Sequence, residues 1–379
     1  MTLNGRRLLD LPCAILAIFG IGLFSPAKIS LWCLFLLLIQ FLVFITALVA
    51  FKDLRNMDAD IWVTGAAVSQ GIVKVIVLLI QKPKFSKIAD ALNNFQLRRG
   101  RSMTINAKRE QKFVQFGMRC QRIYTFIVTW ALFAFITKPV VKRERITPSP
   151  AHYFCNIETL YCYVLQYTAQ CWAATYTIYI LVSVDCLFWS LLSYAYLEME
   201  HIKDILLHLQ VNKQRVGDDW EVLEQISFVV EHHAQILSFV QLINDAYSGL
   251  MIYQCACTFF IVGMSQFCLT INGFPPKLTV MVTYVPYYVA GLCQMFTYCI
   301  AGDIITNQAK SIGDAAFNSH WWIKHQPKLT KALCLVIQRS QRTLTVTVGG
   351  LWVLNLETYS SIIKTTMTML AFVKTIYEN

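Results

Sequence analysis

Apolar residues in this chain are gathered into long runs, which are separated by shorter polar segments. A run of about 20 apolar residues is enough for a helix to cross the hydrocarbon core of a bilayer. Such runs predict spans at roughly 30–51, 61–81, 123–142, 160–195, 247–271, 279–302 and 352–376. The pattern therefore predicts an all-α membrane protein with seven transmembrane helices.

Two stretches continue the helical pattern beyond the predicted spans. Residues 159–210 contain no helix breaker, so the fourth helix is expected to project out of the bilayer. After Gly217 a second helix is expected, with apolar positions four and three residues apart in alternation, as in a coiled-coil seam. The seam consists of Val222, Ile226, Val229, His233, Ile236, Val240, Ile243 and Tyr247. A partner face lies at Leu329, Leu333, Val336 and Ile337. We expect an intracellular helical bundle here, and the periodicity fits a core within one chain as well as a contact between subunits.

The last predicted span carries a polar stripe. It follows a break at Gly349 and Gly350, and its stripe falls within an arc of about 120°. The arc contains Thr365, Thr368, Met369, Phe372, Thr375 and Ile376. Because a polar stripe is costly against lipid, we interpret this face as the wall of a pore, with Phe372 or Ile376 as a hydrophobic constriction. Alternatively, each threonine hydroxyl bonds the carbonyl four residues earlier.

Lysine and arginine are distributed unevenly among the connecting segments. Of 33 such residues, 23 lie in the N-terminus, 82–122, 200–245 and 303–343, whereas 8 lie in the alternate segments. The positive-inside rule then predicts a cytoplasmic N-terminus, and seven spans predict an extracellular C-terminus. G-protein-coupled receptors have the reverse orientation, so that class is disfavoured. Residues 82–122 are expected to form a basic loop, and a short amphipathic helix is expected at the inner interface before the first span.

Composition agrees with a membrane protein and excludes several other classes. The chain has 379 residues, of which 56% are hydrophobic and 15% are charged, whereas a soluble domain is about 25% charged. The net charge of +11 fits an anionic inner leaflet, so nucleic-acid binding is not expected. Cys155 and Cys162 lie near the outer face and could pair, although connectivity stays open. No C-x-x-C motif and no catalytic constellation stands out, so neither a metal, a cofactor nor an enzymatic activity is expected.

Aromatic residues are concentrated in the outer halves of the third, fourth and sixth spans. Some belong to the interfacial belt, but those one or two turns deeper suit a small apolar ligand. Ordinary helix packing remains the alternative for any single residue. Deeper still, Lys74 and Asp185 are candidates for a buried ion pair, with snorkelling as the alternative for Lys74. The aromatic residues are Trp130, Phe133, Tyr161, Tyr163, Tyr167, Trp172, Tyr176, Tyr284, Tyr287 and Tyr288.

The C-terminal sixty residues resemble the signature of insect odorant receptors. The resemblance is carried by Phe317-x-x-x-Trp321, Gln338-Arg339, Gln341-Arg342, Gly349-Gly350, Asn355-Leu356 and Tyr359-x-x-x-x-Lys364-Thr365. It implies a ligand-gated cation channel in which four subunits surround one pore lined by the last span. It also implies a tuning subunit that assembles with a common co-receptor, because the loop between the fourth and fifth spans is short.

The same resemblance implies where the sites lie. Odorant is expected in an outer-leaflet pocket among the second, third, fourth and sixth spans, and the aromatic content suggests an aromatic or heteroaromatic volatile. The expected pore residues are Thr365, Thr368, Phe372, Thr375 and Ile376. The expected ligand-binding residues are Ser69, Ile72, Trp130, Phe133, Thr137, Trp172, Tyr176, Tyr284, Tyr287 and Tyr288.

Three regions follow from these expectations. Residues 1–302 form a ligand-binding transmembrane region that includes cytoplasmic helices at about 197–246, residues 303–348 an anchor region, and residues 349–379 the pore-lining helix. Expected partners are the co-receptor, the volatile, monovalent and divalent cations, and lipid. The expected location is the plasma membrane, in the dendrite of an olfactory sensory neuron. A gustatory-type channel of the same superfamily and a multi-span transporter are the alternatives.

Overall fold

The computed structural model describes residues 7–24, 30–50, 59–99, 107–143, 145–149, 155–209, 219–271, 275–319, 321 and 327–378. Its elements are α1 (Arg7–Ile18), α2 (Leu31–Ala50), α3 (Ala59–Ile80), α4 (Lys82–Arg99), α5 (Ala107–Lys142), α6 (Leu160–Leu207), α7 (Asp219–Thr270), α8 (Leu278–Phe317), α9 (Pro327–Ser340), β1 (Thr347–Val348), β2 (Trp352–Val353) and α10 (Leu356–Glu378). The predicted all-α class is confirmed.

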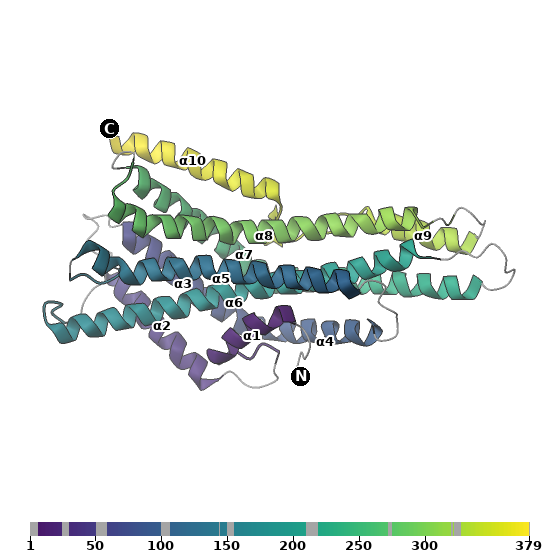
Figure 1. Ribbon diagram of the computed structural model, residues 1–379, viewed down its shortest axis with the longest axis horizontal. Helices are drawn as coiled ribbons and strands as arrows, with labels where there is room; N and C mark the ends of the chain where they lie inside the picture. Colours follow the sequence, from purple (N-terminus) through teal and green to yellow (C-terminus); the bar gives the residue numbers. More distant parts are fainter. Residues whose placement is uncertain are drawn as a thin grey trace.

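Most helices run side by side along the long axis of the molecule (Figure 1). Helix α6 has 48 residues and α7 has 52, and at 1.5 Å per residue each exceeds about 70 Å in length. This is more than twice the roughly 30 Å of a hydrocarbon core, so both helices extend beyond the bilayer. The helix predicted for 159–210 is confirmed, because α6 runs without a break from Leu160 to Leu207.

Five described helices are long and apolar enough to cross a membrane. They contain Ile61–Ile80, Lys108–Val141, Leu160–Leu207, Val222–Thr270 and Leu278–Phe317. The apolar part of α2, Leu31–Thr46, is shorter, and α10 carries threonines along one side. These two helices coincide with the first and seventh predicted spans, so each of the seven predicted spans is helical.

At the end of the molecule where α9 lies, this helix packs beside the long helices α7 and α8 (Figure 1), and their buried apolar side chains belong to one hydrophobic core. The seam predicted on α7 is buried in this core, including Val229, Ile236 and Ile243, and Leu329 and Leu333 of α9 are buried with it. The contacts of α9 are made with α8 and α7 of the same chain. The seam therefore packs as an intramolecular core, which is the first of the two alternatives.

The basic loop expected over 82–122 is wrong, because the described residues of this segment are helical. Helix α4 covers Lys82–Arg99, and α5 begins at Ala107. On α4, Phe85, Ile88 and Phe95 recur at helical spacing and are buried. The ring of Phe95 lies 5.3 Å from the ring of Phe239 on α7. The apolar face of α4 thus packs on the bundle. The loop was predicted from the basic residues of the same segment.

The short N-terminal helix is integrated into the core. Helix α1 packs against α6 and α5, and its Leu8, Leu9 and Leu16 side chains are buried. The carbonyl oxygen of Leu8 accepts hydrogen bonds from Gln121 Nε2 at 3.1 Å and Ser190 Oγ at 2.7 Å. The expected helix is present, and its apolar face is covered by protein.

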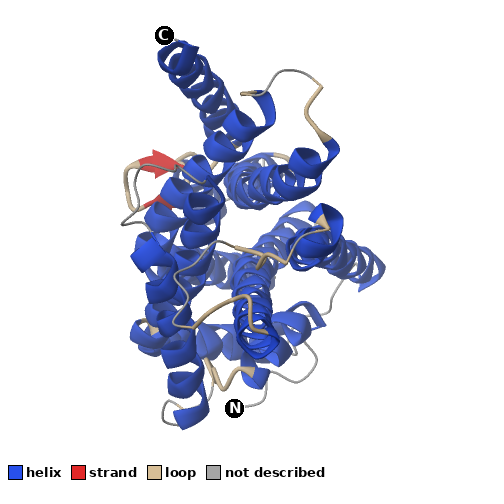
Figure 2. Ribbon diagram, turned by 90° about the vertical axis from the view of Figure 1, so that its left-hand side faces the viewer, coloured by secondary structure: helices blue, strands red, loops and turns tan. Residues whose placement is uncertain are grey.

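A β-hairpin separates α9 from α10 (Figure 2). Gly349 and Gly350 form its turn with φ angles of +59° and +75°, which glycine adopts without strain. Asn244 Oδ1 on α7 accepts a hydrogen bond from the Thr347 backbone N–H at 2.8 Å and so fixes the hairpin to the bundle. Helix α10 then begins at Leu356, where Asn355 Oδ1 accepts a hydrogen bond from the Thr358 backbone N–H at 2.8 Å.

Candidate functional site

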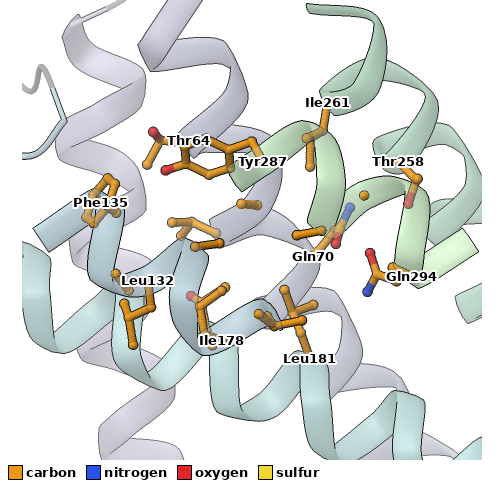
Figure 3. A pocket seen from close by; sticks show the side chains of 18 of the residues that line it. Thr64, Gln70, Leu132, Phe135, Ile178, Leu181, Thr258, Ile261, Tyr287 and Gln294 are labelled. Carbon is orange, nitrogen blue, oxygen red and sulfur yellow. The ribbon is translucent and has the colours of Figure 1, made fainter. Parts of the chain in front are cut away.

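A cavity of about 80 Å³ lies between five helices, α3, α5, α6, α7 and α8. A single water needs roughly 10–15 Å³ on the same measure, so this space is large enough for a small organic molecule. Its lining is mostly aliphatic. Gln70, Thr258 and Gln294 form a polar end, and Thr64 and Tyr287 lie away from that end (Figure 3). The lining residues are Thr64, Ala67, Val68, Gln70, Tyr124, Val128, Ala131, Leu132, Phe135, Ala174, Thr177, Ile178, Leu181, Thr258, Ile261, Tyr287, Ala290, Gly291 and Gln294.

The apolar wall on α5 follows one helical face. Val128, Ala131, Leu132 and Phe135 are spaced at i, i+3, i+4 and i+7, and all four line the cavity. The residues predicted from the sequence do not include this face, because large aromatic side chains were the signal for the ligand site. The helical spacing of these aliphatic positions is the signal that identifies it.

Of the predicted ligand-binding residues, Tyr287 lines the cavity. Tyr284 joins Tyr287 in a neighbouring cavity of about 10 Å³, beside Lys138 and Pro148. Trp130 and Phe133 lie on the outer surface of α5, with exposed fractions of 45% and 63%.

The remaining predicted residues make other contacts. Trp172 stacks on buried Tyr176 with ring centres 5.6 Å apart. Ser69 Oγ accepts a hydrogen bond from Tyr253 at 2.7 Å, and Thr137 donates one to the carbonyl of Phe133 at 2.9 Å. Ile72 is buried and Tyr288 is half-buried, and neither belongs to the cavity lining.

The polar end of the cavity is joined to a buried ion pair. Lys74 donates to Asp185 Oδ1, so the pair that the sequence suggested is confirmed. Tyr298 also donates to Oδ1, while Tyr124 and Gln294 each donate to Oδ2 at 2.6 Å. The carboxylate of α6 is thereby bound to α3, α5 and α8. Tyr124 and Gln294 also line the cavity, so its wall and the ion pair share two side chains.

The segment that precedes α6 is bound to that helix beside the cavity. Gln170 accepts a hydrogen bond from the Ser149 backbone N–H at 3.0 Å and donates one to its carbonyl at 3.0 Å. Ser149 and Gln170 line a further cavity of about 30 Å³, which shares Thr64, Val68 and Phe135 with the main one. Cys155 and Cys162 form a disulfide, which settles the pairing left open by the sequence.

The threonine stripe of α10 is exposed. Thr365, Thr368 and Thr375 all face away from the rest of the chain, whereas Thr366 is buried. Each exposed hydroxyl donates to the carbonyl four residues earlier, at 2.8, 3.0 and 2.9 Å respectively. Phe372 on the same side is 66% exposed, and the side chain of Ile376 lies outside the described residues. Figure 2 shows α10 projecting from the bundle.

Together, these features define a multi-pass helical membrane protein with a mostly apolar cavity between its helices and a separate, polar-striped last helix. The family model described as 7tm Odorant receptor matches residues 62–367. The chain therefore belongs to the insect odorant receptor family. It is a receptor protein of the membrane rather than an enzyme.

Curated relatives and solved structures agree with this assignment. Odorant receptor 67c and putative odorant receptor 85d, both from Drosophila melanogaster, are each 23% identical to this chain, over 47% and 70% of its length. These matches span 43% and 63% of the two relatives. The Drosophila odorant receptor coreceptor is 24% identical over 39% of this chain and 30% of its own length. The insect olfactory receptor OR5 from Machilis hrabei, solved in complex with eugenol, shares the fold with a TM-score of 0.81 and 13% identity, over 98% of both chains.

Proposed function

We propose that this chain is the odorant-binding, or tuning, subunit of a non-selective cation channel that it forms with the common odorant receptor co-receptor. The single observation that carries the channel proposal is the exposed threonine face of α10. In one chain this face has no covering. Each hydroxyl donates to a carbonyl of its own helix, which lowers the cost of a lipid neighbour, but the oxygen lone pairs that water would fill are left without a donor there. Several copies of such a helix around an axis would enclose water.

The proposed ligand site is the cavity between α3, α5, α6, α7 and α8, with Tyr284 and Tyr287 at its outer end. OR5 shares the fold of this chain and was solved with eugenol, a small volatile, which supports a ligand of similar size here. An aromatic or heteroaromatic volatile remains our proposal for its class. Ser69, Ile72, Trp130, Phe133, Thr137, Trp172, Tyr176 and Tyr288 belong to the helices around the cavity but not to its lining, and we retain them as candidates for an indirect effect on binding.

The proposed pore residues are Thr365, Thr368, Phe372, Thr375 and Ile376. They conduct monovalent and divalent cations, with Phe372 and Ile376 at a constriction that opens by wetting. The proposed orientation has the N-terminus in the cytoplasm and the C-terminus outside, in the plasma membrane of an olfactory neuron. The uneven distribution of lysine and arginine supports this orientation.

Two helices connect the cavity to α10. Tyr287 and Gln294 line the cavity from α8, and the ring of Phe296, on the same helix, lies 5.5 Å from the ring of Tyr359 on α10. Helices α7 and α8 are the main packing partners of α10. A ligand that favours one arrangement of α7 and α8 would therefore shift the population of α10 positions and so open the pore.

The test is electrical. The chain is expressed with and without the co-receptor, and currents are recorded during application of a panel of volatiles. We expect volatile-evoked cation currents when both subunits are present and none from uninjected or mock-transfected cells. Absence of any evoked current in both conditions, with the chain shown at the cell surface, would refute the channel proposal.

A further inference from the structure

We propose that the cavity recognises a neutral volatile through one hydrogen-bond-accepting oxygen, of the carbonyl, ester or ether class, which is bound by the side-chain amide of Gln70. The inference deepens the proposed odorant-binding function and rests on it. It assigns a polar contact to one named atom, Gln70 Nε2, and thereby narrows the class of ligand.

Gln70 is a buried donor without an adequate partner. Its side chain is 1% exposed, and Nε2 makes no hydrogen bond with a nitrogen or oxygen of the described residues. The Cys257 thiol interacts with it, but a thiol is a weak acceptor. Buried polar groups are nearly always hydrogen-bonded, so an unpartnered amide at a cavity wall calls for a ligand or water.

The other polar groups of this wall are already engaged. Gln294 donates to Asp185 at 2.6 Å and accepts from Gln254 at 2.7 Å. Tyr124 donates to Asp185 at 2.6 Å, and Thr258 accepts from Gln254 at 2.8 Å. Figure 3 shows Gln70, Thr258 and Gln294 grouped at the same end of the cavity. Gln70 Nε2 is the amide donor there that has no nitrogen or oxygen partner among the described residues.

The rest of the cavity decides the remaining chemistry of the ligand. Val68, Leu132, Ile178, Leu181 and Ile261 provide an aliphatic wall, which favours an apolar body and makes a charged group costly to bury. A volatile with an apolar body and a neutral acceptor oxygen would contact the aliphatic wall and also accept a hydrogen bond from Gln70. A purely hydrocarbon ligand would remove water from Gln70 and leave the amide unpaired.

The experiment compares pairs of volatiles that have the same shape and differ in one atom. Acetophenone is tested against α-methylstyrene, and 2-heptanone against 2-methyl-1-heptene, because a CH₂ group replaces the carbonyl oxygen in each second member. The readout is the ratio of half-maximal concentrations for evoked current in cells that express both subunits. A hydrogen bond of typical net strength predicts about a fivefold preference for the ketone in a responding pair.

The variant Gln70→Met removes the donor at similar volume and is expected to reduce that ratio to near one. The matched control is Val68→Ala on the same helix, which removes apolar contact and should shift both members of a pair equally. Because each ratio is taken within one variant, differences in surface expression cancel. If Gln70→Met does not reach the surface, Gln70→Leu replaces it, and the wild-type ratio still gives a result.

The outcomes separate this inference from the function on which it rests. A ketone preference that disappears in the Gln70 variant and persists in Val68→Ala supports the inference. Equal responses to ketone and hydrocarbon in the wild type, or an unchanged ratio in the Gln70 variant, would overturn it while leaving the receptor function intact. Absence of a response to every volatile, with both subunits at the surface, would instead contradict the proposed function and the inference with it.

Discussion

The carboxylate of Asp185 accepts hydrogen bonds from Lys74, Tyr124, Gln294 and Tyr298, which come from three different helices. Inside a bundle, a charge is tolerated when it is paired and its remaining lone pairs are filled. This arrangement satisfies both conditions. The four contacts also fix the relative positions of the helices that enclose the cavity.

The two members of the ion pair should differ in their effect on stability. Asp185→Leu leaves the buried Lys74 ammonium without its carboxylate and removes the acceptor of three other donors. We therefore expect the free energy of unfolding to fall by about 3–5 kcal/mol. Lys74→Met leaves Asp185 with the donors Tyr124, Gln294 and Tyr298, so the loss should be smaller. Thermal unfolding of the purified protein in detergent measures both.

Asp185→Asn is the control, because it keeps the shape of the side chain and one acceptor oxygen. Its unfolding temperature should fall between those of the wild type and Asp185→Leu. Equal unfolding temperatures for Lys74→Met and Asp185→Leu would show that the three neutral donors contribute nothing to holding the carboxylate.

Among single residues, the sequence predicted the ion pair but only part of the cavity lining. Lys74 and Asp185 stand out because charge within an apolar span is rare. Gln70 and Gln294 do not stand out, since a glutamine in a span is equally compatible with helix packing. The deep aromatic residues were selected for their size, yet Trp130 and Phe133 belong to a different face of α5 from Val128 and Leu132. Choosing between two faces of one helix requires knowing its neighbours.

Among the elements, α9 shows how one buried face holds a short helix in place. Its 14 residues are too few for a stable isolated helix. Leu329, Leu333 and Val336 recur along one side and are buried against α7 and α8. Stability of α9 therefore depends on this contact.

Two leucines of α9 provide a matched comparison. Leu333 is fully buried, whereas Leu335 has an exposed fraction of 60%. Leu333→Ala should lower the free energy of unfolding by about 2–5 kcal/mol, because it leaves a cavity in the core. Leu335→Ala should change the free energy of unfolding by no more than about 0.5 kcal/mol, because the side chain is exposed and leucine and alanine have similar helix propensities. Thermal unfolding in detergent is the measurement.

A result with both variants equally destabilised would mean that Leu335 is covered by another chain in the purified assembly. The same comparison is therefore repeated on protein separated by size into monomer and oligomer. Equal effects that persist in the monomer would contradict the packing of α9 described above.

Element boundaries could be predicted where periodicity was long and uninterrupted. The helix α6 and the seam of α7 follow from the absence of glycine and proline and from regular spacing. Helix α4 was missed because charge outweighed a short apolar face in its segment. The hairpin at Thr347–Val353 was also missed, since two-residue strands carry too little pattern, and only the break at Gly349 and Gly350 was visible.

In the whole molecule, the cavity, the apolar core around α9 and the exposed face of α10 lie in different places. The cavity lies among α3, α5, α6, α7 and α8, and the apolar core around α9 lies at one end of the long axis (Figure 1). Helix α10 packs mainly on α7 and α8. Its exposed threonine face is thus the part of the chain that most needs partners.

The two sides of α10 should differ in their access to water within the assembled channel. Thr368 is exposed on the stripe, whereas Thr366, two residues earlier, is buried against the bundle. If the stripe lines a pore, Thr368→Cys should react with a charged, water-soluble methanethiosulfonate reagent and lose most of its volatile-evoked current. Thr366→Cys should keep its current, because its thiol faces protein.

The control is the wild-type chain treated with the same reagent, because eleven described cysteines are free. Current is recorded before and after treatment in the same cell. Loss of current in Thr366→Cys together with an unaffected Thr368→Cys would mean that the pore lies on the opposite side of this helix, whereas current that persists in both variants would remove α10 from the conduction path.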